Sequence, residues 1–232
     1  MKAIEVEHLT FSYDGQKLIL NDISFSIEQG EFVAIIGDSG CGKSTLCHIL
    51  CGIIPAAIGG EISGRAVVGG RLLSEVKLKD MAKTVGFVMQ DPDRQIVTSA
   101  VEDELAFGPE NLCIAPKEIK KTVDETLEFL QLKKLRLCNP NKLSGGQKQL
   151  VTIGSVLTLE PSIVIMDEPF SHLDSSGRER AAAVVDNLKK ASKTVIAVEH
   201  DHSTISRADR WLLLENGRIK ADGKPREVVK YL

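Results

Sequence analysis

The segment Gly37–Ser44, which reads G-D-S-G-C-G-K-S, constrains the fold of this chain more than any other stretch. It matches the pattern G-x-x-x-x-G-K-S and lies directly between the strand-like run Glu31–Ile36 and a helical pattern. Its glycines let the backbone curl so that N–H groups face one point, and the start of the helix adds positive potential there. A chance glycine-rich turn is the alternative, but the order of strand, loop and helix favours a phosphate-binding loop.

Short apolar runs recur along the rest of the chain. Five of them consist of bulky or β-branched residues without strict alternation, which is typical of strands buried on both faces of a parallel sheet. These runs are Phe32–Ile36, Val85–Val88, Ile163–Met166, Val195–Val198 and Trp211–Leu214. We expect them to form one central sheet.

Helical patterns lie between these strands. Apolar residues recur at helical spacing at Leu46/Ile49/Leu50/Ile53 and again at Ala181/Val184/Val185/Leu188. We expect the first of these helices to end at Pro55 and Gly59-Gly60. Strands that alternate with helices predict an α/β layer structure.

The stretch from Asp91 to Ser155 lacks comparable strands. Its apolar residues recur at helical period over Ile119/Val123/Leu127/Leu130, and Pro116 occupies a suitable first-turn position. A chain of 232 residues with 43% hydrophobic content can bury one substantial core. We therefore expect a single domain over residues 1–232, in which residues 1–90 and 156–232 form the α/β core and residues 91–155 form an inserted helical lobe.

Bulk composition disfavours several classes of function. A net charge of −3 and a sequence pI near 6.0 leave no basic footprint for a nucleic-acid backbone. Acidic residues interrupt the N-terminus where a secretion signal is apolar, and the apolar stretch Leu46–Ile58 falls short of the ~20 residues that cross a bilayer. Five cysteines without repeated spacing are typical of reduced cytosolic thiols. We expect an intracellular protein that reaches a membrane only through a partner.

The phosphate-binding loop predicts its own ligand contacts. Lys43 would reach the β- and γ-phosphates of a nucleotide, Ser44 would give its hydroxyl oxygen to Mg²⁺, and Thr45 would contact the α-phosphate. The loop residues that would supply the remaining contacts are Gly37, Asp38, Ser39, Gly40, Cys41 and Gly42.

Two cysteine patterns near this loop have competing interpretations. Cys41 either makes the loop sensitive to thiol reagents or merely packs. Cys47-His48-x-x-Cys51 has the residue types of a metal site, but it lies in a helix that we expect to be largely buried. We therefore assign packing there and no zinc.

Two adjacent acids close the run Ile163–Met166. At the end of a strand, Asp167 is placed to hold Mg²⁺ opposite the phosphate-binding loop, and Glu168 projects toward the terminal phosphate. A carboxylate there polarises an attacking water as general base, which is worth on the order of 10²–10⁴ in rate. Taken alone, two acids at a strand end are more often solvated loop residues, so the assignment depends on the other motifs.

The segment Leu143–Gln147, L-S-G-G-Q, lies between these two motifs. By itself it is compatible with an ordinary helix start in which Ser144 is the N-cap. The three motifs together resemble the ATP-binding-cassette (ABC) ATPases, and the resemblance spans nearly the whole chain. It implies an α/β fold of the P-loop NTPase type with a parallel-sheet core, an N-terminal antiparallel β subdomain and an inserted helical subdomain. ATP and Mg²⁺ are the implied ligands, and ATP hydrolysis is the implied activity.

The resemblance also implies that one copy of the chain cannot complete its own site. In ABC proteins the segment Leu143–Gln147, here called the signature, faces ATP held by a second cassette, so two cassettes packed head-to-tail enclose two ATP molecules. The residues expected to contact that ATP are Ser144, Gly145, Gly146, Gln147 and, in the loop that crosses between cassettes, Asp174. Asp174 can also cap the helix that we expect near Ser176.

Three further residues take roles from the resemblance. His200 follows Glu168 by 32 residues (200 − 168) and corresponds to the switch histidine that hydrogen-bonds the γ-phosphate. Gln90 corresponds to the glutamine that contacts Mg²⁺ and the attacking water, and Tyr13 to the aromatic ring that stacks on adenine. Without the resemblance, His200 is a packing or surface residue and Tyr13 belongs to a hairpin turn.

The region Gln90–Asn111 indicates a branch of the family. Its runs Gln90–Val97 and Val101–Asn111 resemble the energy-coupling-factor ATPases. In that branch the stretch receives the coupling helices of a transmembrane scaffold, which also holds a substrate-capture subunit for vitamins, cobalt or nickel. A generic acidic linker is the alternative, but it leaves Phe107–Asn111 unexplained. The resemblance therefore implies a peripheral subunit at the cytoplasmic face of the cell membrane.

Some positions depart from the family pattern. Gln149-Leu150 and Phe170–His172 replace residues that are common in the family, which alters the surroundings of the cross-cassette contacts and leaves the ATP-contacting groups intact. The chain stops at Leu232 without the longer tail that many of these ATPases use to hold their dimer. We therefore expect dimerisation to depend on a second cassette, an identical chain or, as the short tail suggests, a different one. Motors of exporters or other importers are rival functions. So are soluble ABC proteins of DNA repair or translation, whose coiled coils, zinc modules or second cassettes do not occur here.

Overall fold

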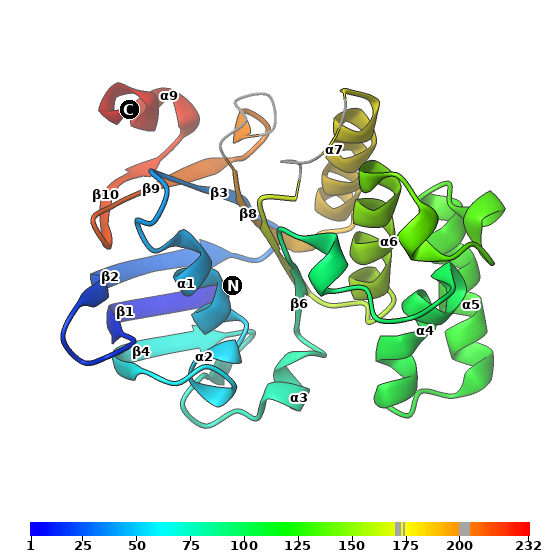
Figure 1. Cartoon of the computed structure of the whole chain (residues 1–232). Helices are drawn as coiled ribbons and strands as arrows, with labels where there is room; N and C mark the ends of the chain where they lie inside the picture. Colours follow the sequence, from blue (N-terminus) through cyan, green and yellow to red (C-terminus); the bar gives the residue numbers. More distant parts are fainter. Residues whose placement is uncertain (170–172, 174, 200–204) are drawn as a thin grey trace.

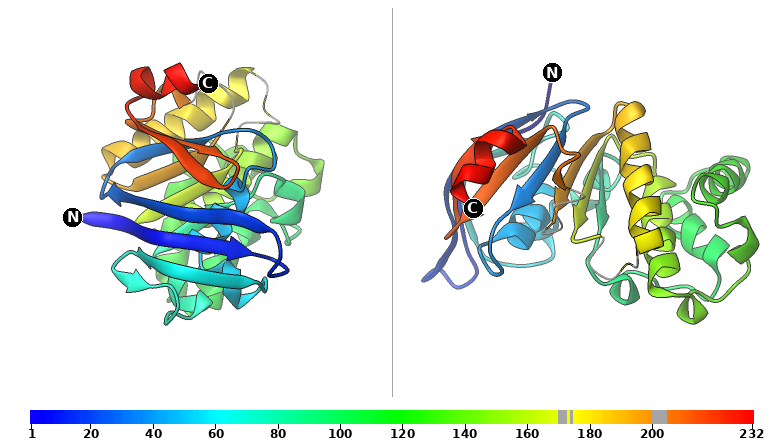
Figure 2. Two further views of the ribbon diagram at one scale, coloured as in Figure 1. Left: turned by 90° about the vertical axis from the view of Figure 1, so that its left-hand side faces the viewer. Right: turned by 90° about the horizontal axis from the view of Figure 1, so that it is seen from above.

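The computed structural model describes residues 1–169, 173, 175–199 and 205–232 (Figure 1). These residues form a six-stranded sheet and a four-stranded sheet. Seen from above, both sheets lie on one side of the molecule, and helices α4, α5 and α6 lie on the other (Figure 2). The layered arrangement confirms the predicted α/β fold class.

The six-stranded sheet contains all five predicted apolar runs. Its order is β10-β9-β3-β8-β7-β6, with parallel pairing throughout except between β9 and β10. Every residue of β3, β7 and β8 is buried, as expected for strands covered on both faces. The strands are β3 (Phe32–Ile36), β6 (Val85–Val88), β7 (Ile163–Asp167), β8 (Thr194–Val198), β9 (Arg210–Glu215) and β10 (Arg218–Gly223).

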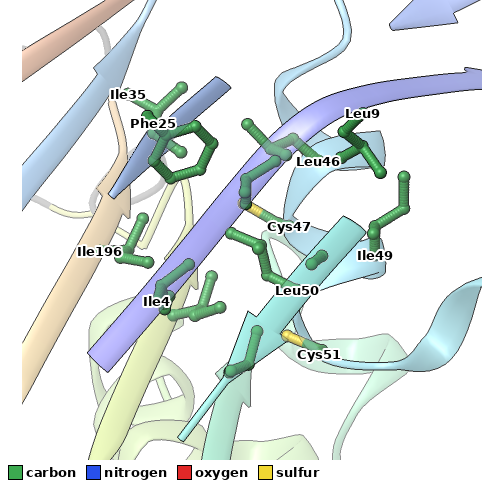
Figure 3. Packing of buried hydrophobic residues seen from close by; sticks show 14 of the residues in the cluster. Ile4, Leu9, Phe25, Ile35, Leu46, Cys47, Ile49, Leu50, Cys51 and Ile196 are labelled. Atoms are coloured by element: carbon green, nitrogen blue, oxygen red, sulfur yellow. The ribbon is translucent and has the colours of Figure 1, made fainter. Parts of the chain in front are cut away.

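The four-stranded sheet is antiparallel and has the order β2-β1-β4-β5. Its strands are β1 (Lys2–Ser12), β2 (Leu18–Glu28), β4 (Glu61–Val68) and β5 (Arg71–Leu72). Helix α1 (Lys43–Leu50) packs against both sheets through one hydrophobic cluster. Figure 3 shows Leu46, Cys47 and Leu50 of α1 beside Ile4 of β1 and Ile196 of β8. The helix that follows the phosphate-binding loop is therefore fixed from two sides.

Helix α1 ends earlier than the sequence predicted. We expected it to reach Pro55, but Cys51 is its C-cap and Gly52 adopts a left-handed conformation with φ 74°. Glycine takes this conformation without steric cost, so it stops the helix although apolar spacing continues to Ile53. Two short helices follow, α2 (Ile53–Ala56) and α3 (Leu78–Met81).

Helices dominate the stretch from Pro92 to Leu157. Pro116 is the first residue of α5, as predicted for a proline at a helix start. The helices of this stretch are η1 (Pro92–Arg94), α4 (Val101–Asn111), α5 (Pro116–Phe129), η2 (Lys133–Leu135), η3 (Pro140–Lys142) and α6 (Gly145–Leu157). A second hydrophobic cluster joins α4, α5 and α6 to the other face of the six-stranded sheet. The division into a core and a lobe at residues 91 and 155 stays a prediction.

The remaining helices are α7 (Ser175–Lys190), α9 (Pro225–Val228) and η4 (Val229–Tyr231). Among the described helices, none has the length and apolar character that a membrane crossing requires.

Leu105→Ala should lower the free energy of unfolding by about 2–5 kcal/mol, because it removes a fully buried side chain from the contact between α4 and α6. Leu105 Cδ1 lies 3.4 Å from the point where a Cβ on Gly154 of α6 would sit, so the side chain packs directly against the backbone of that helix. Urea denaturation measures the effect. The same substitution at Leu137, which is 76% exposed, is the control and should leave the unfolding midpoint nearly unchanged.

Candidate active site

A cavity of about 530 Å³ lies beside the phosphate-binding loop. Most of the predicted nucleotide contacts line it, although they come from segments far apart in the sequence. The lining residues are Tyr13, Ile19, Ser39, Gly40, Gly42, Lys43, Ser44, Thr45, Gln90 and Glu168. Ile19 is a member of this set that the sequence did not predict, since an apolar residue in a strand gives no signal of its own.

The loop depends on two of its glycines for its path. Gly37 has φ 144°, and a Cβ there would overlap the carbonyl oxygen of Leu214 in β9. Gly42 has φ 110°, and a Cβ there would lie 2.8 Å from Leu20 Cδ2. Because a side chain at either position meets strain and a neighbouring strand, the loop runs closer to β2 and β9 than any other residue type permits.

The ammonium group of Lys43 is enclosed by its own loop. Its Nζ donates to the carbonyl oxygens of Gly37 and Asp38, both at 2.7 Å, and the side chain is almost completely buried. Cys41 Sγ lies 3.9 Å from the same nitrogen. Burial raises the pKa of the Cys41 thiol, against the opposing effect of Lys43, so the thiol stays protonated near neutral pH. The lysine is thus held at the centre of the loop.

Tyr13 stands at the mouth of the cavity. Its hydroxyl lies 3.1 Å from Thr45 Oγ1 of α1, and its ring meets Phe11 edge-to-face with centroids 4.8 Å apart. The ring is nevertheless 47% exposed. An aromatic ring that is fixed at two points and open on one side is suited to stacking with a planar group.

Asp167 is a buried acid at the end of β7. Its side chain is 6% exposed, and its Oδ1 has no hydrogen-bond partner among the described residues. Burial raises the pKa of Asp167, the Ser44 hydroxyl opposes this effect, and the charge of Glu168 adds to it. A buried carboxylate oxygen without a donor, next to a hydroxyl, fits a hard cation such as Mg²⁺.

Glu168 and Gln90 meet at the ends of two neighbouring strands. Parallel pairing of β6 with β7 sets Val88 opposite Met166, so Gln90 and Glu168 each lie two residues beyond this pair. Gln90 Nε2 donates to Glu168 Oε2 at 2.6 Å. Glu168 adopts φ 46°, a left-handed conformation that costs a non-glycine residue of order 1–3 kcal/mol. Its amide donates to the Val198 carbonyl of β8 at 2.9 Å, which holds the turn in place.

The signature begins helix α6 and does not line the cavity of its own chain. Ser144 is the N-cap, as its residue type indicates: Ser144 Oγ accepts from the Gln147 amide at 3.4 Å, and Gln147 Oε1 accepts from the Ser144 amide at 3.0 Å. A Cβ on Gly146 would meet only ordinary contacts, of which the nearest is Leu173 Cδ2 at 3.6 Å. Nothing in the described part of the chain therefore requires glycine at position 146.

The other site predictions fall elsewhere. His200 and Asp174 lie outside the described residues. Cys47 and Cys51 are buried in the core beside Ile49 and Leu50 (Figure 3), and burial raises the pKa of both thiols. These thiols therefore stay protonated and pack as small apolar side chains.

A second cavity, of about 320 Å³, lies between the core and the helices that follow Gln90; we call it the lobe groove. Leu78 and Phe87 line it from the core side, and Gln95, Glu104 and Phe107 from the helical side. The sequence did not indicate that Glu104 is buried, or that Gln95 is half-buried, in such a place. Phe107 is 46% exposed, so an apolar side chain of the lining is accessible to solvent.

Comparison with known proteins agrees with these motifs. The sequence pattern described as ABC transporter matches residues 20–171. The chain belongs to the ABC transporter family. Within that family it resembles the ATP-binding proteins of the energy-coupling-factor type. The energy-coupling factor transporter ATP-binding protein EcfA1 of Streptococcus mutans is 38% identical to it, over 98% of this chain and 80% of that protein.

Solved structures of ABC cassettes have the same fold. The structure of cbiO1 from Clostridium perfringens, described as part of the ABC transporter complex cbiONQ, superposes with a TM-score of 0.88 at 30% identity, over 99% of this chain and 91% of that one. A dimeric post-hydrolysis state of the cassette MJ0796, bound to ADP and Pi, gives 0.83 at 25% identity, over 95% and 98% of the two chains. Several curated ABC relatives are longer, and this cassette spans about two fifths of their length.

Asp167→Asn should raise the free energy of unfolding of the magnesium- and nucleotide-free cassette at about pH 8, because the amide has no charge to desolvate. The raised pKa of Asp167 means that its proton stabilises the fold. That contribution is complete below the unfolded-state pKa and is lost as the pH rises through the folded-state pKa. The gain from the substitution should therefore shrink toward about pH 4.

Urea unfolding at a series of pH values measures this difference. Asp103→Asn, at an exposed position on α4, is the control and should show no such trend. A gain at Asp167 that is independent of pH, or a loss of stability at high pH, would contradict the account of the buried carboxylate.

Proposed function

We propose that this cassette hydrolyses ATP to drive a membrane importer of the energy-coupling-factor type, working as one half of a head-to-tail pair. The observation that carries the proposal is the cavity in which Gln90 and Glu168 are hydrogen-bonded opposite the phosphate-binding loop. A loop suited to phosphates and a carboxylate held at the same cavity are the two requirements of a nucleotide hydrolase.

The cavity suits a nucleotide bound in one direction. The loop amides and the start of α1 would face the β-phosphate, while the Lys43 ammonium would exchange a loop carbonyl for phosphate oxygens. Tyr13 would stack on the adenine at the exposed end. Ser44, Asp167 and Gln90 would hold Mg²⁺. The assignment is supported by Asp167 Oδ1, which has no hydrogen-bond partner among the described residues. When bound, the ion supplies positive charge to the phosphate oxygens.

Glu168 is the proposed general base. Its carboxylate would accept a proton from the attacking water, and the amide of Gln90 would fix the orientation of the carboxylate and of the water. The left-handed turn supports this role, because strain of this kind persists where the surrounding structure holds a side chain in a functional position.

The signature is proposed to act on ATP held by a second cassette. The amide groups at the start of α6 and the Ser144 hydroxyl would contact the γ-phosphate from the other side. The absence of any contact in the described chain that requires glycine at position 146 supports a constraint from outside the chain. Gly145, Gln147 and Asp174 complete the proposed contact in trans, and His200 is proposed to bond the γ-phosphate within its own chain. The dimeric form of the related cassette, with ADP and Pi bound, is consistent with this arrangement.

The lobe groove is the proposed docking site for a transmembrane scaffold subunit. The resemblance of Gln90–Asn111 to the energy-coupling-factor ATPases supports this choice, and the groove lies between that region and the core. Its apolar lining and the exposed Phe107 suit the apolar face of a short helix from the partner. Association with the cytoplasmic face of a membrane would follow from this contact, with uptake of a vitamin, cobalt or nickel as the work performed.

Glu168→Gln should lower the rate of phosphate release by roughly 10²–10⁴-fold, because the amide cannot accept a proton from water. ATP binding should persist, and the pair of cassettes should stay closed around ATP. Steady-state phosphate release and size-exclusion chromatography with ATP measure the two effects. Glu125→Gln, at an exposed position on α5, is the matched control. Turnover equal to that of the control would remove Glu168 as the base.

Phe107→Ser should abolish copurification of the cassette with its membrane subunits after coexpression and detergent extraction, because it removes the apolar side chain at the mouth of the lobe groove. ATP binding should be retained. Phe129→Ser, on α5 and 41% exposed, is the control and should copurify normally. If both variants copurify equally well, the partner docks elsewhere; if no membrane protein copurifies with the natural chain, the transport proposal fails.

A further inference from the structure

The segment that follows Gln90, residues Asp91–Ala100, is fixed at three points; we call it the bridge segment. Gln95 anchors it to β6, since Gln95 Oε1 accepts from the Met89 amide at 2.9 Å and its Nε2 donates to the Phe87 carbonyl at 3.2 Å. Strand β6 is an edge strand of its sheet, so this side chain satisfies backbone groups that a neighbouring strand would otherwise pair. Met89, which Gln95 holds, directly precedes Gln90.

Glu104 fixes the other end of the bridge segment. Its side chain is 3% exposed, and its Oε2 accepts from the amides of Val97 and Thr98 at 3.0 and 2.9 Å. A buried carboxylate that receives two backbone amides is a strong, directional anchor. It ties the bridge segment to α4, and both Gln95 and Glu104 line the lobe groove.

The third contact joins the bridge segment to the signature helix. Lys148 Nζ lies 2.5 Å from Asp93 Oδ1 of η1, and the lysine side chain is only 16% exposed. Lys148 follows Gln147 directly, and its amide donates to the Ser144 carbonyl at 2.9 Å. The ion pair therefore acts on the first turn of α6, whose capping box contains Ser144 and Gln147.

We propose that the bridge segment is a strut that sets the position of Gln90 relative to the signature, with Asp93, Gln95 and Lys148 as positioning residues. Gln95 holds Met89, the residue directly before Gln90, and the Asp93–Lys148 ion pair holds the first turn of α6, so the two ends of the strut are set by side chains of this chain alone. This inference rests on the proposed function for its catalytic consequence, and on the described contacts for its mechanical part.

A purely structural role makes a different prediction. A partly exposed ion pair contributes little to folding stability, so its removal should then leave both unfolding and hydrolysis nearly unchanged. A positioning role predicts instead that hydrolysis falls while unfolding stays nearly constant. Since none of the three residues lines the nucleotide cavity, their effect on hydrolysis would have to act through the positions of Gln90 and Ser144.

The test in the assembled transporter uses Asp93→Asn, Lys148→Met and the double exchange of Asp93→Lys with Lys148→Asp. Each single change should lower kcat for ATP by roughly 2- to 30-fold with an unchanged KM. The exchange should recover most of the loss, since it restores an ion pair of reversed sign. Lys133→Gln removes a more exposed lysine–carboxylate pair, with Glu128 at 2.8 Å, and is the control without loss of kcat. The strut is overturned if the single variants have the same kcat as the control. It is also overturned if the loss of kcat in the double exchange equals the product of the losses in the two single variants.

Hydrogen exchange in the isolated full-length chain tests the same strut without reference to hydrolysis. Gln95→Ala should speed amide exchange at Met89, and Asp93→Asn should speed exchange in the first turn of α6. Unchanged exchange at both places overturns the strut whatever the transporter does. Faster exchange at both places, in a chain whose complex does not hydrolyse ATP, would support the strut and count against the proposed function alone.

Discussion

Close packing of the phosphate-binding loop against β9 is the constraint on which the site depends. The carbonyl oxygen of Leu214 occupies the space where any side chain at position 37 would begin, so the chain leaves β3 along a path open only to glycine. Lys43 then closes the loop through the carbonyls of Gly37 and Asp38. Since α1 is clamped between two sheets, the loop has a fixed base from which Ser44 and Thr45 face the cavity.

Local chemistry was the part of this molecule that the sequence predicted best. Bulky, non-alternating runs identified the five parallel strands, because burial on both faces leaves no room for polar residues. Ser144 and Gln147 form the capping box that their spacing suggests. The predicted end of α1 was wrong. Apolar residues continue at helical spacing to Ile53, but the left-handed φ of Gly52 ends the helix before that. Hydrophobic periodicity reports which face is buried and is insensitive to a single backbone angle.

Contacts between distant segments could not be predicted from the motifs alone. Gln90 and Glu168 are 78 residues apart, and they meet because β6 and β7 are neighbours in the sheet with a particular register. Resemblance to a family named both residues, but their hydrogen bond depends on strand order. Gln95 and Glu104 gave still less signal, since each is a polar residue in a polar stretch and becomes informative only when its backbone partners are known.

Gly146 illustrates a constraint that folding does not impose. Its surroundings leave room for a methyl group, at ordinary contact distance from Leu173 and Gly177. Alanine has a higher helix propensity than glycine, so redesign of the isolated chain for thermal stability would favour it at this position, the second of α6. Such a redesign would improve the folded monomer while changing the surface that it presents to another molecule. On the proposed function, stability and assembly make opposite demands on this position, and glycine meets the second.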